Sequence, residues 1–231
     1  MVLLDDDFSS IVKAVRLGRR IYDNLRKAMG FIFAVHVPIA GLALLPLVFG
    51  LPIIFGPIHI AFLELVIDPV CTLVFEAERE EDDIMNRPPR DPKEPLFTGQ
   101  LLLWSGIQGA LAFALVAAIY VFGYRRGMPE TETRALAFFS LVTAIIALIL
   151  VNRSFSSSLW AALFRSNRIL KYVLVAVVGA STLSLWWPVA TKLFRFGPLH
   201  ADDLAITVGA GFAVLGALEL VKRFARIRLA A

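Results

Sequence analysis

The sequence has little cysteine and few charged residues, and both shortages exclude classes of protein. Cys71 is the one cysteine among 231 residues, so the chain can form neither an internal disulfide nor a multi-cysteine metal site. Charged residues make up 18% of the chain, against about 25% in an average soluble protein. The first ten residues, MVLLDDDFSS, lack the basic segment and apolar run of a signal peptide. Insertion into a membrane is therefore expected to rely on the apolar segments that follow.

Apolar residues dominate the rest of the chain. Hydrophobic residues make up 58% of it and the mean hydropathy is +0.73, whereas soluble domains are about 45–50% apolar. Six apolar runs have about the 17–25 residues that a helix needs to cross a bilayer. We therefore predict an all-α membrane protein, a six-helix transmembrane bundle with an N-terminal cytoplasmic stalk helix. The predicted spans are residues 28–49, 53–75, 101–122, 135–151, 172–189 and 204–221.

The stalk helix is predicted from the residues before the first span. Between Asp5 and Lys27, apolar side chains recur with helical spacing, and acidic residues precede basic ones, as suits the helix dipole. We assign residues 1–27 to this cytoplasmic part and residues 222–231 to a basic cytoplasmic tail.

Basic residues predict the orientation of the bundle. Of the 23 lysines and arginines, 18 lie in the segments on one side of the predicted spans and five on the other. By the positive-inside rule, the richer side and both termini are cytoplasmic. The basic residues flank apolar runs and form no patch interleaved with aromatic residues, so the lipid bilayer is the expected partner and nucleic acid is not.

Two carboxylates stand out within the second predicted span. Glu64 and Asp68 are four residues apart, so on a helix they project from one face. An ionised carboxylate in hydrocarbon is costly unless it is paired, protonated or bound to a cation. Pro69 follows directly and removes a backbone donor, which frees carbonyl oxygens. The pattern predicts a cation site on a broken helix, and the alternative is a hydrogen-bonded pair that holds helices together.

Two polar motifs resemble a known family. The run SSIVKAVRLGRRIYDNLRKAM, from Ser9 to Met29, and the run DDIMNRPPRDPKEPLF, from Asp82 to Phe97, look like the C-terminal membrane half of cation-transporting P-type ATPases. The similarity is to the calcium-pump-like branch of bacterial type. It implies that this chain supplies the last six spans, and that four earlier spans and the ATP-handling domains precede them.

The resemblance also identifies motifs that this chain lacks. The family's DKTG phosphorylation motif and its TGDG hinge motif are both absent. Met1–Asp7 resembles the end of the phosphorylation domain. We therefore expect a fragment or a separately encoded half, which cannot turn over ATP alone and whose partner is the missing N-terminal half of the pump. No cofactor is expected in this chain. ATP and Mg²⁺ would act only through the missing domains.

The resemblance implies a ligand set for the transported cation. Glu64 and Asp68 match two ligand positions on the family's broken helix, and His36 matches an amide ligand on the helix before it. Three further ligand positions of the calcium pumps hold isoleucine here. Because calcium takes six to eight oxygens, a two-calcium arrangement is doubtful and a single ion fits better. The three substituted positions are Ile39, Ile67 and Ile145.

His36 and Glu76 leave alternatives open. Beside two acids, His36 could bind a transition metal or exchange protons, or it could be a core histidine bonded to a carbonyl. Glu76 lies near the cytoplasmic end of the second predicted span, where we interpret it as a solvated residue at the mouth of the site.

A stiff loop follows the second span. The resemblance implies that this loop contacts the phosphorylation domain and couples it to the membrane helices. The residues assigned to this coupling loop are Arg87, Pro88, Pro89, Arg90 and Pro92.

Two functions follow from these observations. The first is the ion-translocating membrane domain of an ATP-driven cation pump, in a bacterial plasma membrane. The second is a membrane module without catalytic activity, such as a truncated product, an accessory subunit or a passive ion pathway.

Overall fold

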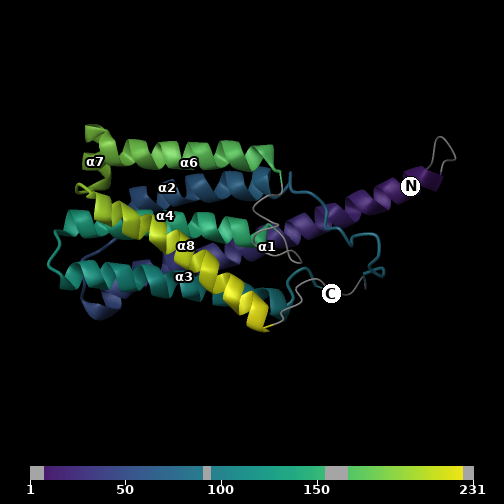
Figure 1. The fold of residues 1–231 in the computed structure, drawn as a ribbon, viewed down its shortest axis with the longest axis horizontal. Helices are drawn as coiled ribbons and strands as arrows, with labels where there is room; N and C mark the ends of the chain where they lie inside the picture. Colours follow the sequence, from purple (N-terminus) through teal and green to yellow (C-terminus); the bar gives the residue numbers. More distant parts are fainter. Residues whose placement is uncertain (1–7, 91–94, 154–165, 226–231) are drawn as a thin grey trace.

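The computed structural model describes residues 8–90, 95–153 and 166–225. Over these residues the chain is helical and forms no strand. Six helices are long and apolar enough to cross a membrane, which confirms the predicted all-α membrane fold (Figure 1). These helices are α1 (Phe8–Phe49), α2 (Pro57–Pro69) with its continuation η1 (Val70–Val74), α3 (Gly99–Arg125), α4 (Glu130–Asn152), α6 (Arg168–Trp186) and α8 (Ala201–Ala225); a short helix, α7 (Pro188–Phe194), precedes α8.

The first helix combines the stalk and the first span. α1 runs without interruption for 42 residues, with Pro38 and Pro46 inside it. At 1.5 Å per residue it is about 63 Å long, roughly twice the thickness of the hydrocarbon core of a bilayer. Its N-terminal part projects beyond the other helices (Figure 1). We call this end of the bundle the stalk end.

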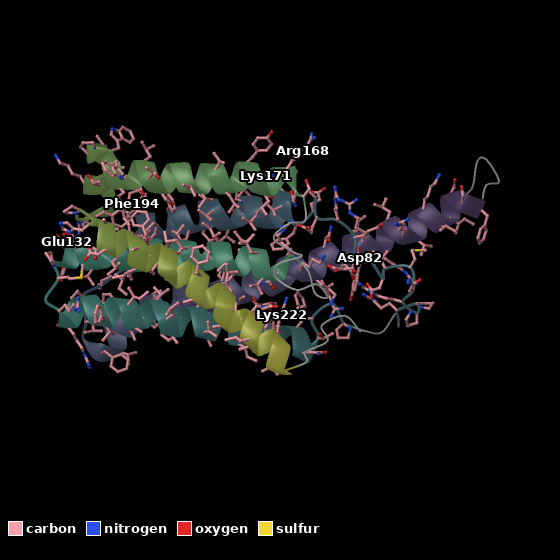
Figure 2. All side chains as sticks on the ribbon, viewed as in Figure 1. Asp82, Glu132, Arg168, Lys171, Phe194 and Lys222 are labelled. Atoms are coloured by element: carbon pink, nitrogen blue, oxygen red, sulfur yellow. The ribbon has the colours of Figure 1, made fainter. Side chains whose placement is uncertain are left out.

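Charged side chains gather at the two ends of the bundle. Figure 2 shows Arg168, Lys171 and Lys222 at the stalk end and Glu132 at the opposite end. Between these ends the sticks are mostly carbon, as a helix surrounded by lipid requires.

A tight hairpin joins the first two spans. Gly50 has a φ of 64°, which a glycine adopts without strain. Gly56 is the N-cap of α2, and Pro57 begins the helix in the first turn, where its missing amide hydrogen costs nothing. The hairpin therefore brings α2 back antiparallel to α1.

The core of the bundle is built around α4. Of the most apolar 18 residues of this helix, 83% are buried, compared with 22% in α6. α4 packs against α8, α3 and α1, while α6 contacts η1 and α7. The second span therefore lies between the central helices and α6 (Figure 1).

One close approach fixes the packing of α1 on α3. A Cβ atom at Gly109 would lie 2.5 Å from the carbonyl oxygen of Ala34 and 2.6 Å from the Cβ of Val37. Only a residue without a side chain allows the two backbones to come this near. Gly106, one turn earlier on α3, has no atom within 4 Å of such a position.

This contrast gives a test of the packing. We expect Gly109→Ala to destabilise the bundle by about 1–3 kcal/mol, because backbone atoms of α1 must move. Gly106→Ala should be neutral or slightly stabilising, since alanine favours a helix. The midpoints of thermal unfolding in detergent micelles would measure both. Equal midpoints for the two variants would contradict the packing described here.

Candidate functional site

The helix pattern changes at Pro69. Proline cannot donate a backbone hydrogen bond, and beyond it the chain forms a π-helical turn in which the amide of Phe75 bonds to the carbonyl of Val70 at 3.1 Å. The hydroxyl of Thr72 donates to the carbonyl of Asp68 at 2.8 Å. The sequence predicted a broken helix here. The structure has a change of hydrogen-bond register without a gap.

His36 and Glu64 meet across α1 and α2. The Nε2 of His36 lies 3.8 Å from Oε1 of Glu64, and both side chains are about half exposed. The other ring nitrogen, Nδ1, is 2.8 Å from the carbonyl oxygen of Ile32. Because a carbonyl can only accept, Nδ1 carries the hydrogen, and Nε2 of the neutral ring faces the carboxylate with its lone pair.

Asp68 lies one turn beyond Glu64 on the same helix, and its side chain is exposed. In the described ranges, no group of three or more His, Cys, Asp and Glu side chains is close enough to hold a metal ion. The structure thus brings His36 and Glu64 together and leaves Asp68 beside them.

Three positions that resemble oxygen-ligand positions of calcium pumps are apolar and buried. Ile39, Ile67 and Ile145 have exposed fractions of 7%, 2% and 0%. All three belong to the hydrophobic core. They contribute packing and no oxygen ligand.

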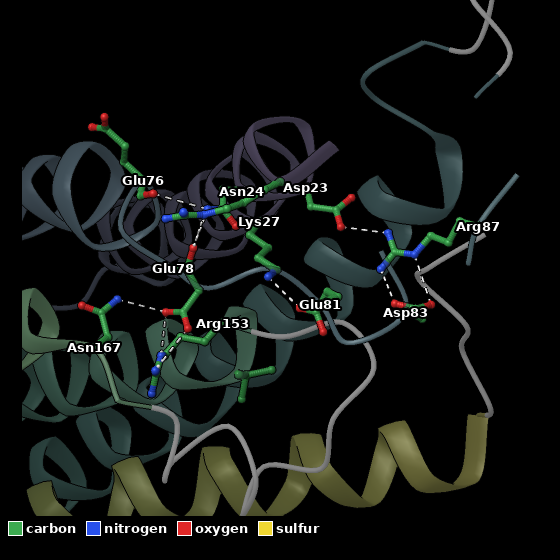
Figure 3. A network of polar contacts seen from close by, with 12 residues as sticks. Asp23, Asn24, Lys27, Glu76, Glu78, Glu81, Asp83, Arg87, Arg153 and Asn167 are labelled. Carbon is green, nitrogen blue, oxygen red and sulfur yellow. Dashed lines mark hydrogen bonds and ion pairs between the residues drawn. The ribbon is translucent and has the colours of Figure 1, made fainter. Parts of the chain in front are cut away.

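A second set of polar residues lies at the stalk end, where η1 leads into the loop before α3 (Figure 3). Glu78 is fully buried and forms an ion pair with Arg153, with a distance of 3.0 Å between Oε2 and Nε. The Asn167 amide donates to the same carboxylate at 3.1 Å. The Glu78 carbonyl accepts from Asn24 at 2.9 Å and from Arg20 at 3.0 Å. Glu78 therefore joins α1, the end of α4 and the start of α6.

Lys27 and Glu81 form the second buried ion pair. Their Nζ and Oε1 atoms are 2.6 Å apart, and neither side chain is exposed. A buried charge that loses its partner costs far more than an exposed one, so this pair ties the loop to α1.

Arg87 makes the third connection. Its guanidinium contacts Asp23 of α1 at 2.8 Å and Asp83 of the loop at 2.7 Å. The hydrogen bond to Arg87 lowers the pKa of Asp83, and the same bond raises the pKa of Arg87. At pH values above the ordinary carboxyl pKa, this ion pair therefore stabilises the folded protein. The stabilisation is lost as the pH falls through the lowered pKa of Asp83.

The other predicted coupling-loop residues have different surroundings. The Arg90 guanidinium lies 4.3 Å from the ring centre of Tyr22. Pro88 and Pro89 are exposed, and Pro92 lies outside the described residues.

We call the polar residues of these three connections the stalk-end network. Most of its members were not predicted from sequence. The signal was the acidic run EAEREEDD directly after a span, which faces the basic inner part of α1. Its members are Asp23, Asn24, Lys27, Glu78, Glu81, Asp83, Arg87, Arg153 and Asn167.

The buried pair gives a stability test. We expect Lys27→Met to destabilise the protein by about 3–5 kcal/mol, because the buried Glu81 carboxylate loses the cation that lies 2.6 Å from it. The double variant Lys27→Met with Glu81→Met should recover most of this loss. Unfolding midpoints in detergent would check both.

A control is the exposed ion pair between the same two segments, Arg16 with Glu80. Arg16→Met should shift the midpoint much less, since an exposed pair is screened by water. If the double variant is no more stable than Lys27→Met alone, the ion pair does not account for the effect.

Comparison with known proteins identifies the family. Residues 52–224 match the model of the family described as "Cation transporting ATPase, C-terminus". "Calcium-transporting ATPase 1" of Lactococcus lactis is 33% identical over 177 residues, which cover 77% of this chain and 20% of the relative. "Calcium-transporting ATPase" of Bacillus subtilis is 29% identical over 215 residues, or 90% of this chain and 24% of the relative.

The name of a third relative refers to a different ion. "Potassium-transporting ATPase alpha chain 2" of Oryctolagus cuniculus is 37% identical over 123 residues, which cover 53% of this chain and 11% of the relative. The chain thus spans no more than about a quarter of the length of these relatives. The family match covers most of the chain, including five of the six candidate membrane spans. The chain therefore belongs to the family of C-terminal membrane domains of P-type cation-transporting ATPases.

Proposed function

We propose that this chain is the ion-translocating membrane domain of an ATP-driven cation pump, with the cation held by Glu64, Asp68 and His36. The observation that carries the proposal is the contact between His36 and Glu64 at 3.8 Å. The two ligands come from different helices within apolar spans, where polar groups of this kind are costly and usually functional.

The chemistry of these three side chains suits an exchange of cation and proton. Glu64 and Asp68 offer carboxylate oxygens, and the lone pair of His36 Nε2 offers one nitrogen. A bound cation neutralises the carboxylates, and protons can do so when the cation has left. One nitrogen with few oxygens favours a single ion, including a transition metal, over two calcium ions.

Movement of α1 against α2 would change the affinity of the site. His36 belongs to α1, whereas Glu64 and Asp68 belong to α2, so a displacement of one helix separates the ligands. Since α1 is continuous from the stalk to His36, a force applied to the stalk reaches the ligand directly. In this proposal, phosphorylation in the missing domains drives that displacement.

The stalk-end network couples the loop to α1 in the same mechanism. Arg87 holds the loop to α1 through Asp23, and the segment with Pro88, Pro89, Arg90 and Pro92 would meet the phosphorylation domain. The partners are then the N-terminal half of the pump, in the same or a separate polypeptide, and the lipid bilayer. ATP and Mg²⁺ bind only the missing domains.

The excess of basic residues on the stalk side supports a cytoplasmic location for both termini. The bacterial relatives support a bacterial plasma membrane. Because the relatives' names include both calcium and potassium, the cation is to be identified by experiment.

The site itself is tested by removing its charges. In the complete pump that contains this chain, we expect Glu64→Gln or Asp68→Asn to abolish cation-stimulated phosphorylation with little loss of folded protein. A neutral amide is cheaper to bury than a carboxylate. Phosphoenzyme formation would be measured with Ca²⁺, Mn²⁺ and K⁺ added singly.

Two carboxylates outside the site serve as controls. Glu130→Gln and Asp202→Asn change exposed acids in the first turns of α4 and α8. Both should retain the cation dependence of the parent. Unaltered cation dependence in the Glu64 and Asp68 variants would remove these residues from the mechanism.

The coupling proposal has its own test. We expect Arg87→Gln to lower the maximal cation-stimulated ATPase rate of the complete pump about tenfold, with little change in apparent cation affinity. Arg87→Gln removes the charge-assisted contacts to Asp23 and Asp83, and the contact to Asp23, which joins the loop to α1, is by itself worth about 1.5–3 kcal/mol. The matched control is Arg79→Gln, which changes an exposed arginine in the same loop. A change in affinity without a change in rate would contradict the coupling role.

A further inference from the structure

A cavity lies between α1 and η1 at the stalk end. It has a volume of about 420 Å³, enough for several water molecules. Its lining includes Asn24 and Ala28 on α1, and Thr72 and Glu76 on the opposite wall. His36 and Glu64 lie outside this lining.

The register of the two antiparallel helices connects the cavity to the cation site. His36 contacts Glu64. Asn24 and Glu76 lie twelve residues closer to the stalk end than His36 and Glu64, respectively. There the side-chain amide of Asn24 donates to the backbone carbonyl of Glu76 at 3.4 Å. Because the register is the same at both places, the cavity and the cation site lie along one helix–helix seam.

Oxygen-bearing side chains follow this seam at every fourth position. Glu64 and Asp68 lie on α2, Thr72 lies on η1 and Glu76 lies in the turn that follows η1, and the last three are exposed. Thr72 donates its hydrogen to the carbonyl of Asp68 and so keeps its lone pairs for a ligand. Within the described residues, the carboxylates of Asp68 and Glu76 form no hydrogen bond or ion pair that would hold them elsewhere.

One basic residue and one acidic residue line the cavity, Arg20 and Glu76. The Nε of Arg20 donates to the carbonyl of Glu78 at 3.0 Å, which draws the guanidinium toward the stalk-end network. The carboxylate of Glu76 points away from that network (Figure 3). Arg20 also lies close enough to Glu80 to lower the pKa of that carboxylate, and Glu80 is outside the lining. The positive charge of Arg20 is therefore offset by Glu80, and Glu76 supplies the charge that a solute in the cavity meets.

We propose that this cavity is a water-filled vestibule through which an inorganic cation reaches Asp68 and Glu64 from the stalk end. Glu76 is the first carboxylate that the cation meets, and the hydroxyl of Thr72 is the next oxygen along the seam. The inference rests on the proposed cation site, to which it adds the route of access.

Charge-selective labelling of cysteines tests the vestibule. In a chain with Cys71→Ala, Thr72→Cys and Ala28→Cys place a thiol on opposite walls of the cavity. Each variant would be treated in membranes with a cationic and an anionic methanethiosulfonate reagent of similar size, applied from the stalk side. Relative to a small thiol in solution, we expect the cationic reagent to be favoured about tenfold. Glu76→Gln should remove this preference.

A matched control is Thr182→Cys on α6. Thr182 also donates to the carbonyl four residues earlier, at 2.8 Å, but it lies near the end of α6 opposite the stalk, away from Glu76. Its thiol, treated with the same two reagents from that opposite side, should show no preference that depends on Glu76.

Several results would overturn the vestibule. One is that neither thiol, at Thr72→Cys or at Ala28→Cys, reacts with either reagent. The others are that the preference for the cationic reagent persists in the Glu76→Gln background, or that the anionic reagent reacts faster. Glu64→Gln should leave the labelling preference unchanged while it abolishes cation-stimulated phosphorylation. The vestibule and the proposed site can therefore fail independently.

Discussion

Compensation of buried charge is the constraint on which this structure depends. Lys27 with Glu81, and Glu78 with Arg153, place four charged side chains where almost none of their surface reaches solvent. Each charge is tolerable only because its partner is fixed beside it. The partners come from α1, the loop after η1 and the end of α4, so electrostatic compensation also determines how these segments are joined.

The carboxylates of the second span and of the loop after it divide into two classes by the same criterion. Glu78 and Glu81 have permanent cationic partners and hold the structure together. Glu64 has only a histidine at 3.8 Å, and Asp68 is exposed beside it. A carboxylate without a permanent partner can take a cation or a proton in turn. Groups of this second class suit the proposed exchange of cation and proton, whereas groups of the first class keep their partners.

The sequence predicted the helical fold and the acid pair because both depend on local patterns. Apolar runs indicate spans, and Glu64 and Asp68 share a face by their spacing alone. The stalk-end network depends on which distant residues meet. Arg153 and Asn167 are 75 and 89 positions from Glu78 along the chain, and no single pattern predicts those pairs. The π-helical turn after Pro69 was also missed, since a proline indicates an interruption but not the hydrogen bonds that replace it.

The continuity of α1 turns the stalk into a lever arm. Lys27, held by Glu81, is nine residues from His36, which is about 14 Å along a helix axis. If α1 pivots at Lys27, a tilt of about 5° moves His36 sideways by about 1 Å. The separation between His36 and Glu64 is 3.8 Å, so even a small angular change outside the membrane alters the spacing of these two proposed ligands within it.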